Sequence, residues 1–311
     1  MPSANPRVTV IMATWNWSEV LPFAIGSVLL QTFGDFELLV VGDGCTDDSE
    51  RVVADIGDPR VRWLNLPENH GHQSAPNNEG LRQARGELVA YLGHDDLWLP
   101  HHLDCLVKAI EEGADLAHGI VRMVAPGDEQ ACLIRSNYVP GDWIPPSSVV
   151  HRRALVTAAG GWADYRTLSC DPDGELWRRF HAAGARIRFV PRLTAIKLPA
   201  AARRIVYKKR PWREQAAWLE RIRSTDVEAE ELGALLVDAE ARAAPKPFRA
   251  LLGEVARRGA ASLRARLRPK PAPQGPGEDL DRRRRYKGLD SRTGNAAGPP
   301  GPRAAASGAL E

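Results

Sequence analysis

Short apolar runs alternate with helical patterns along the first 110 residues of the chain. Four runs, Val8–Ala13, Phe36–Val41, Arg60–Leu64 and Leu88–Leu92, are rich in branched or aromatic side chains and have the length of buried strands. Between them, apolar residues recur at helical spacing, as they do in Val20–Leu29. This alternation predicts an α/β fold, with a mostly parallel, Rossmann-like sheet and helices on both of its faces.

The middle of the chain is less regular but still predicts mixed secondary structure. We expect strands at Leu116–Val124, Leu133–Tyr138, Val149–His151 and Arg186–Val190, and helices at Arg152–Ala159 and Asp173–Ala183.

The composition changes again near residue 200. Helices are expected at Arg213–Arg223, Val227–Ala244 and Phe248–Leu267. From Pro269 onward Pro, Gly, Arg and Ala predominate and large apolar residues almost disappear, so this tail is expected to be disordered. The chain therefore divides into an α/β domain at 1–205, a C-terminal helical appendage at 206–268 and a disordered tail at 269–311.

Charge and cysteine content narrow the class of protein. The net charge of +3 is too small to indicate nucleic-acid binding, and the four cysteines form no CxxC pair that would suggest zinc or a disulfide framework. No apolar run approaches the ~20 residues that cross a bilayer, and the N-terminus lacks a signal-peptide pattern. We therefore expect a cytoplasmic protein. The basic run Arg282–Arg285 fits either a solvated tail or a peripheral contact with anionic lipid on the cytoplasmic face of a membrane.

Polar residues gather where the predicted strands end. Thr14, Trp15 and Asn16 follow the first strand, Asp43 follows the second, and His94, Asp95 and Asp96 follow the fourth. Ligands of parallel sheets bind beyond the carboxyl ends of the strands, so these side chains can share one site. Neighbouring carboxylates need solvent or a cation, and their oxygens suit Mg²⁺ and Mn²⁺. Because neither GxGxxG nor GxxxxGK[ST] occurs, a phosphate would be held through such a metal.

Six elements of the sequence match a known family in order and spacing. They are Val8–Asn16, Ser27–Phe33, Val40–Asp47, the loop and helix at Pro67–Asn69 and Asn78–Leu81, Leu92–Pro100 and Asp173–Arg179. Over about the first 200 residues the chain resembles family 2 glycosyltransferases with the GT-A fold. The resemblance implies transfer of a sugar, with inversion, from a UDP-, GDP- or dTDP-linked donor to a hydroxyl of a glycan, a lipid-linked molecule or a small molecule.

The resemblance also implies roles for individual residues. Asp43 would bond the nucleobase, the loop of Thr14, Trp15 and Asn16 would lie against that base, and Asn77 would lie near the diphosphate. Asp96 would coordinate Mn²⁺ or Mg²⁺, and Asp95 would contact the ribose or reach the metal through water. Asp173 would take the proton of the acceptor hydroxyl. A single base suffices for inversion because one direct displacement occurs on the face opposite the leaving group.

Several positions depart from the family pattern. Gly93 stands where a further Asp is frequent, Asn77 stands where an Arg is usual, and Pro172 stands where a Glu usually precedes the base. The last change leaves Asp171 as a rival base. Five further side chains each have two interpretations. His94 is a phosphate contact or a loop residue, and His151 is a diphosphate contact or a core residue. Trp143, Trp162 and Tyr165 are sugar-stacking or packing residues.

Three other functions share part of this sequence pattern. The departures are compatible with a catalytically degenerate GT-A domain that binds a nucleotide, a glycan or a partner. A nucleotidyltransferase would share the fold, but Thr14–Ser18 is neither glycine-rich nor basic. A histidine–aspartate phosphohydrolase needs its His-Asp pair inside a helix bundle, whereas His94-Asp95 ends a predicted strand.

Overall fold

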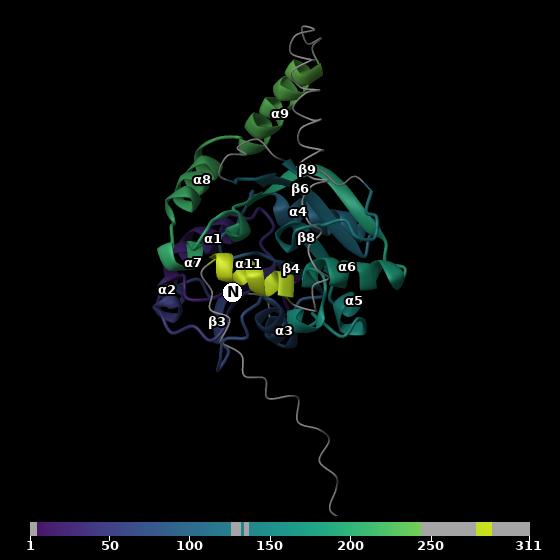
Figure 1. Ribbon diagram of the computed structural model, residues 1–311. Helices are drawn as coiled ribbons and strands as arrows, with labels where there is room; N and C mark the ends of the chain where they lie inside the picture. The colour runs from purple at the N-terminus through teal and green to yellow at the C-terminus, as the bar shows by residue number, and fades with distance from the viewer. Residues whose placement is uncertain (1–4, 126–131, 134–136, 244–277, 288–311) are drawn as a thin grey trace, which may run out of the picture.

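A single mixed sheet forms the centre of the protein (Figure 1). The computed structural model describes residues 5–125, 132–133, 137–243 and 278–287. The strands are β1 (Val8–Thr14), β2 (Phe36–Gly42), β3 (Val61–Asn65), β4 (Leu88–Tyr91), β5 (Leu97–Trp98), β6 (Leu116–Met123), β7 (Cys132–Leu133), β8 (Val149–Arg152) and β9 (Ile187–Lys197). They follow the order β3-β2-β1-β4-β8-β6-β9-β5, with β7 paired to β6.

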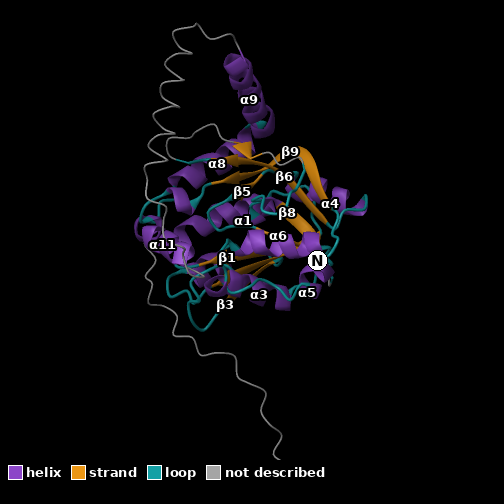
Figure 2. Ribbon diagram, turned by 45° about the vertical axis from the view of Figure 1, so that its right-hand side comes forward, coloured by secondary structure: helices purple, strands orange, loops and turns teal. Residues whose placement is uncertain are grey.

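The described helices cover both faces of this sheet (Figure 2). The α-helices are α1 (Leu21–Leu29), α2 (Ser49–Asp55), α3 (Ser74–Gln83), α4 (His102–Glu111), α5 (Arg153–Ala158), α6 (Pro172–Ala182), α7 (Val206–Lys209), α8 (Arg213–Ser224), α9 (Val227–Ala243) and α11 (Glu278–Lys287). Short 3₁₀ turns are η1 (Ser18–Val20), η2 (Pro146–Ser148), η3 (Tyr165–Thr167) and η4 (Ala200–Ala202).

The predicted parallel half of the sheet is confirmed. Strands β3, β2, β1 and β4 pair in parallel, so their carboxyl ends meet at one edge. Alternate residues of β1 enter different cores: Val10 packs with α1 and α4, and Ile11 packs with residues of α5 and α6. Burial on both faces explains why these strands read as continuous apolar runs rather than as alternating patterns.

The second half of the sheet differs from the sequence prediction. Strand β8 runs antiparallel to both β4 and β6, and β9 continues past its predicted end at Val190 to Lys197. Pro191 is tolerated there because the β6–β9 register is irregular between His118 and Val121. The two-residue strand β5 was not predicted, and α3 begins at Ser74, within Asn69–Asn78, which its polar, Gly-containing sequence predicts to be a loop.

The helical appendage belongs to the same body as the sheet. Leu219 and Ile222 of α8 share a hydrophobic core with Leu97 of β5 and Ile196 of β9. Helix α9 extends away from this body (Figure 1). The predicted helix Phe248–Leu267 lies outside the described residues. No helix in the described part of the chain has both the length and the apolar character needed to cross a membrane.

The prediction of a disordered tail is wrong for residues 278–287, which form α11. Arg284 of this helix is buried, and Arg283 pairs with Asp171 of the α/β domain. Residues 278–287 cannot build a core of their own, but charged and polar groups of the domain hold them in place. The local sequence does not reveal these partners.

Candidate active site

The carboxyl ends of β1 and β4 open onto a large cavity. Its volume of about 670 Å³ lies within the range of ligand-binding pockets. Of the predicted site residues, Asn77, Asp95, Trp143, Asp171 and Asp173 line it. An adjoining pocket of about 120 Å³ is lined by Thr14, Trp15, Asp43, His94 and Asp95, among others. The structure therefore brings the ends of three predicted strands and the start of α6 together in one site.

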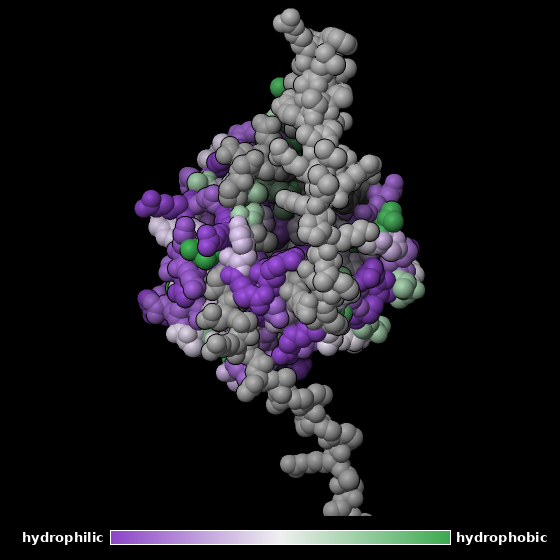
Figure 3. All heavy atoms as spheres, viewed as in Figure 1, coloured by the Kyte–Doolittle hydropathy of each residue, from purple (hydrophilic) through white to green (hydrophobic). Residues whose placement is uncertain are grey.

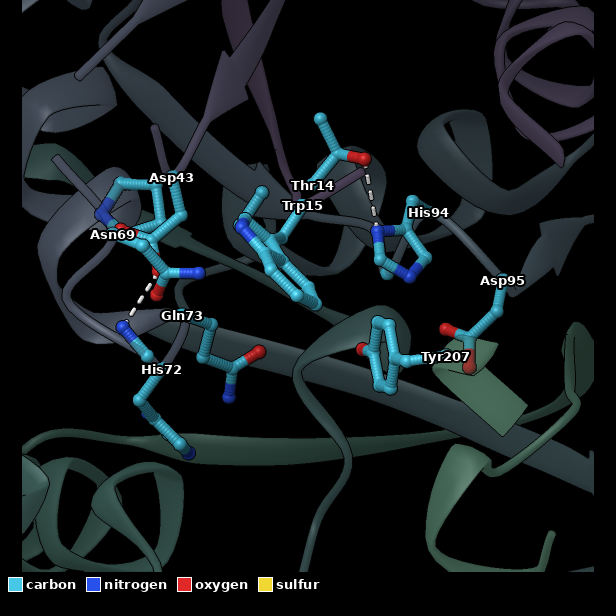
Figure 4. A pocket seen from close by; sticks show the side chains of 13 residues that line it. Thr14, Trp15, Asp43, Asn69, His72, Gln73, His94, Asp95 and Tyr207 are labelled. Carbon is cyan, nitrogen blue, oxygen red and sulfur yellow. Dashed lines mark hydrogen bonds between the residues drawn. The ribbon is translucent and has the colours of Figure 1, made fainter. Parts of the chain in front are cut away.

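The smaller pocket is framed by side chains from separate segments of the chain (Figure 4). Trp15 lies between Asp43 on one side and Tyr207 on the other, with a distance of 5.9 Å between the Trp15 and Tyr207 ring centroids. The two carboxylate oxygens of Asp43 accept hydrogen bonds from the backbone N–H groups of His70 and Gly71, at 2.9 and 2.8 Å. Burial raises the pKa of Asp43, and these two donors act in the opposite direction. Asp43 thus fixes the shape of this pocket.

Two further predicted site residues make their polar contacts within the protein. Asn16 has a left-handed φ of 42°, and its side chain exchanges two hydrogen bonds with Thr46 outside the described lining of either pocket. The Nδ1 atom of His94 lies 3.0 Å from the Thr14 hydroxyl oxygen, and its ring packs edge-on against Trp17. Burial lowers the pKa of His94, so the imidazole is neutral near pH 7 and brings no positive charge to a phosphate.

Asp96, the predicted metal ligand, is fully engaged by the protein. Its Oδ2 atom accepts hydrogen bonds from the Lys197 ammonium at 2.7 Å and the Ser147 hydroxyl at 2.5 Å. Its Oδ1 atom accepts one from the Leu198 backbone N–H at 3.0 Å, and the residue is 0% exposed. Burial raises the pKa of Asp96, and Lys197 opposes this. In this structure Asp96 anchors the turn through a buried ion pair, and its role as a metal ligand stays a prediction.

Asp95 is the carboxylate that faces the cavity. It lines both pockets, and no described residue donates a hydrogen bond to its side chain. Its backbone carbonyl accepts a hydrogen bond from Gln215 of α8 at 3.4 Å, which helps to hold the turn. The described residues contain no cluster of three His, Cys, Asp or Glu side chains able to enclose a metal. A single carboxylate such as that of Asp95 fits Mg²⁺ or Mn²⁺ when phosphate oxygens and water supply the remaining ligands.

Asp173 lies in the first turn of α6 and lines the same cavity. Its Oδ2 atom accepts a hydrogen bond from Trp143 Nε1 at 3.1 Å, and its Oδ1 atom accepts one from the Gly174 N–H at 2.9 Å. Burial and the neighbouring charge of Asp171 raise the pKa of Asp173 to about 6. A carboxylate with a pKa near the working pH suits proton abstraction. Its rival Asp171 is more exposed and pairs with Arg283.

The remaining aromatic and histidine candidates belong to the packing of the domain. His151 is 0% exposed in β8 and packs against Tyr91 and Phe180, so its interpretation as a diphosphate contact is wrong. Trp162 packs edge-on against Tyr91 at 5.0 Å. Tyr165 is covered by Arg284 of α11.

Sequence reasoning missed several residues of the site. Lys197 is a single cation within the apolar stretch Leu193–Leu198, and that isolation was a usable signal. Ser147 and Tyr207 carry no comparable pattern, because only the folded chain brings them to the Gly93–Asp96 turn and to Trp15.

Comparison with known proteins now identifies the domain. The sequence pattern described as Glycosyl transferase family 2 matches residues 9–144. The UDP-Glc:alpha-D-GlcNAc-diphosphoundecaprenol beta-1,3-glucosyltransferase WfgD of Escherichia coli is 27% identical over 148 residues, which are 48% of this chain and 54% of that protein. S. aureus TarS 1-349 in complex with UDP-GlcNAc has a TM-score of 0.55 at 19% identity, covering 72% of this chain and 69% of that one. Mannosyltransferase PcManGT from Pyrobaculum calidifontis in complex with GDP-Man and Mn²⁺ has a TM-score of 0.51 at 20% identity, covering 84% and 82%.

The mixed sheet and its structural neighbours define a protein of the GT-A glycosyltransferase fold. Within that class, residues 9–144 match the model of glycosyl transferase family 2. The matches span 33%, 54% and 36% of the lengths of the first curated relatives.

Proposed function

We propose that this protein is a metal-dependent, inverting glycosyltransferase that uses a nucleotide-sugar donor. One observation carries the proposal: Asp95 and Asp173, from distant parts of the chain, line one cavity in different environments. Asp95 has no hydrogen-bond donor among the described side chains, whereas Asp173 is buried and has a pKa of about 6. The first arrangement suits a metal ligand and the second suits a general base.

In the proposed reaction, an acceptor hydroxyl attacks the anomeric carbon of the donor sugar. The new C–O bond forms as the bond to the diphosphate breaks, and the hydroxyl proton passes to Asp173. Trp143 holds that carboxylate in place through its indole N–H. A divalent cation at Asp95 would supply charge neutralisation for the departing nucleoside diphosphate. The pocket beside Trp15 and Asp43 would receive the nucleobase of the donor.

We further propose a lipid-linked or polysaccharide acceptor. The support comes from the printed activities of relatives, among them WfgD, whose acceptor is a diphosphoundecaprenol-linked sugar. The neighbours bound to UDP-GlcNAc and to GDP-Man support a nucleotide-sugar donor without selecting its base.

The proposal is tested by nucleoside diphosphate release. Purified full-length protein is incubated with UDP-, GDP- and dTDP-sugars, with Mn²⁺, Mg²⁺ or EDTA, and with lipid-linked and soluble saccharide acceptors. We expect release that needs metal and acceptor together. Asp173→Asn should slow it by about 10²–10⁴-fold, the usual contribution of a general base. Asp171→Asn, the matched control in the same turn, should change it by less than about 10-fold.

The same experiment addresses the degenerate-domain alternative. Metal-dependent nucleotide binding without turnover on any acceptor would favour a binding module. An equal loss in Asp171→Asn and Asp173→Asn would mean that the two carboxylates do not have the separate roles proposed.

A further inference from the structure

The C-terminal helix α11 lies beside the cavity. Figures 1 and 2 show it alongside α7 and across the body of the domain. It packs against α7 and η4, and the backbone N–H of Ile205 donates a hydrogen bond to the carbonyl of Tyr286 at 2.8 Å. Figure 3 shows strongly hydrophilic side chains gathered on the face that α11 crosses. This location makes a basic helix part of the surroundings of the site.

The cations of α11 contact the domain at defined points. Arg283 lies 2.9 and 3.1 Å from the two carboxylate oxygens of Asp171. Arg284 is 4% exposed and donates a hydrogen bond to the Tyr165 hydroxyl at 2.6 Å. A Cβ atom at Gly71 would overlap the Arg284 guanidinium, so this guanidinium packs directly on the loop that Asp43 holds. The helix is therefore docked with one particular face toward the site.

The cations of α11 change the charge of the cavity lining. The described lining includes the carboxylates of Asp95, Asp171 and Asp173, which would repel a diphosphate. Its lysines and arginines are Lys197 and three residues of α11: Arg283, Arg284 and Lys287. Lys197 is bonded to Asp96, and Arg283 is bonded to Asp171. Most of the cationic charge at the lining thus comes from the C-terminal helix.

Lys287 of α11 and Asp95 both line the large cavity. Burial lowers the pKa of Lys287, and the Asp95 carboxylate acts in the opposite direction. Lys287 lines the large cavity but not the smaller pocket beside Asp43. The helix therefore leaves the proposed base pocket open while it borders the space next to Asp95.

The docking of α11 also supports the segment that carries Tyr207. Ile205, the N-cap residue of α7, has a φ of 51°, a conformation that β-branched residues rarely adopt. Its N–H group is satisfied by Tyr286 of α11. Two residues later, Tyr207 packs against Trp15 at the smaller pocket. The same helix thus supplies cations to one pocket and holds the backbone behind the other.

We propose that α11 is a wall of the donor site and that Lys287, aided by Arg284, contacts the diphosphate of the nucleotide sugar. This inference rests on the proposed function. It assigns part of the donor site to the far C-terminal segment, about 190 residues beyond Asp95 in sequence.

Titration of the full-length protein with UDP, GDP and dTDP, in the presence of Mg²⁺, tests the assignment. For the nucleotide that binds wild type most tightly, Lys287→Ala should weaken binding by about 10-fold or more, as expected for loss of a charge-assisted hydrogen bond. The effect on the matching nucleoside monophosphate should be smaller, because it lacks the second phosphate. Arg285→Ala, an exposed change on the same helix, is the matched control and should bind like wild type.

The outcomes separate this inference from the proposed function. Binding by wild type that Lys287→Ala leaves unchanged would overturn the role of α11 alone. Tighter binding in Lys287→Ala would also overturn it, since α11 would then obstruct the site. Absence of binding to all three nucleotides in wild type would overturn both the proposed function and the inference. Arg284→Ala, which removes the packing on Gly71, should weaken binding in the same direction as Lys287→Ala.

Discussion

Asp95 and Asp96, in the turn between β4 and β5, are neighbours in sequence but opposites in environment. Asp96 is inaccessible and satisfies three donors of the protein, among them Lys197. Asp95 faces the cavity, and its side chain accepts no hydrogen bond from the described residues. The two neighbouring carboxylates therefore have different roles. Asp96 stabilises the turn, and the Asp95 carboxylate is accessible to a ligand that enters the cavity.

The largest expected effect separates these tasks by stability. Asp96→Asn leaves the Lys197 ammonium buried without its counter-charge, which should lower the free energy of unfolding by about 3–5 kcal/mol. Asp95→Asn should change it by less than about 1 kcal/mol, because no described partner is lost. Urea denaturation at pH 7 measures both.

Activity gives the complementary half of this test. Asp95→Asn should remain folded and lose metal-stimulated release of nucleoside diphosphate. A stable Asp96→Asn protein that has lost only its metal response would support the assignment of the metal to Asp96.

The parallel half of the fold and much of the site could be predicted from sequence. Polar residues closely follow apolar runs such as Val8–Ala13. Parallel pairing of the strands then places Thr14, Asp43 and Asp95 at one edge of the sheet. The division between Asp95 and Asp96 could not be predicted in this way. It depends on Ser147 and Lys197, which arrive from 51 and 101 residues away.

The same limit applies to the C-terminal region. Its composition correctly signals that it cannot form a core of its own. Composition does not show that Asp171 and Tyr165 provide partners for Arg283 and Arg284. Long-range pairing of charges, unlike apolar periodicity, leaves no regular pattern along the chain.

The next effect compares Asp173 with its neighbour Asp171. The pKa of Asp173 is about 6 in the folded protein, above the ordinary value of 3.8, so the folded state favours the protonated acid. The stability that this preference contributes is present below about pH 4 and is lost as the pH rises through about 6. At pH 8, Asp173→Asn should therefore be more stable than wild type by up to about 3 kcal/mol.

Thermal and urea unfolding at pH 4 and pH 8 check this prediction. The gain should appear at pH 8 and vanish at pH 4. Asp171→Asn should show no such gain, because it removes the partner of Arg283. A gain of equal size at both pH values would argue against burial of the Asp173 charge as its cause.

A smaller effect concerns Asn16, whose side chain bonds Thr46 in the structure. Asn16→Ala removes both hydrogen bonds and places a Cβ-only side chain at a positive φ, so it should lower stability by about 1–2 kcal/mol. Because Asn16 is absent from the described lining of the pockets, the KM for the donor should change by less than about 2-fold. Unfolding and steady-state kinetics measure the two effects, and a 10-fold rise in KM with unchanged stability would return Asn16 to the nucleotide site.

The smallest effect tests how Trp143 tunes the proposed base. Activity should rise with pH around 6 as Asp173 loses its proton, and the Trp143 indole N–H lowers the pKa of that carboxylate. Trp143→Phe keeps an aromatic ring but removes this donor, so the rising limb of the pH–rate profile should move upward by about 0.5 unit. Profiles of kcat and kcat/KM for both proteins, measured with saturating metal, provide the comparison. An unshifted limb accompanied by a higher KM for the acceptor would mean that Trp143 contacts the sugar and does not set the pKa of Asp173.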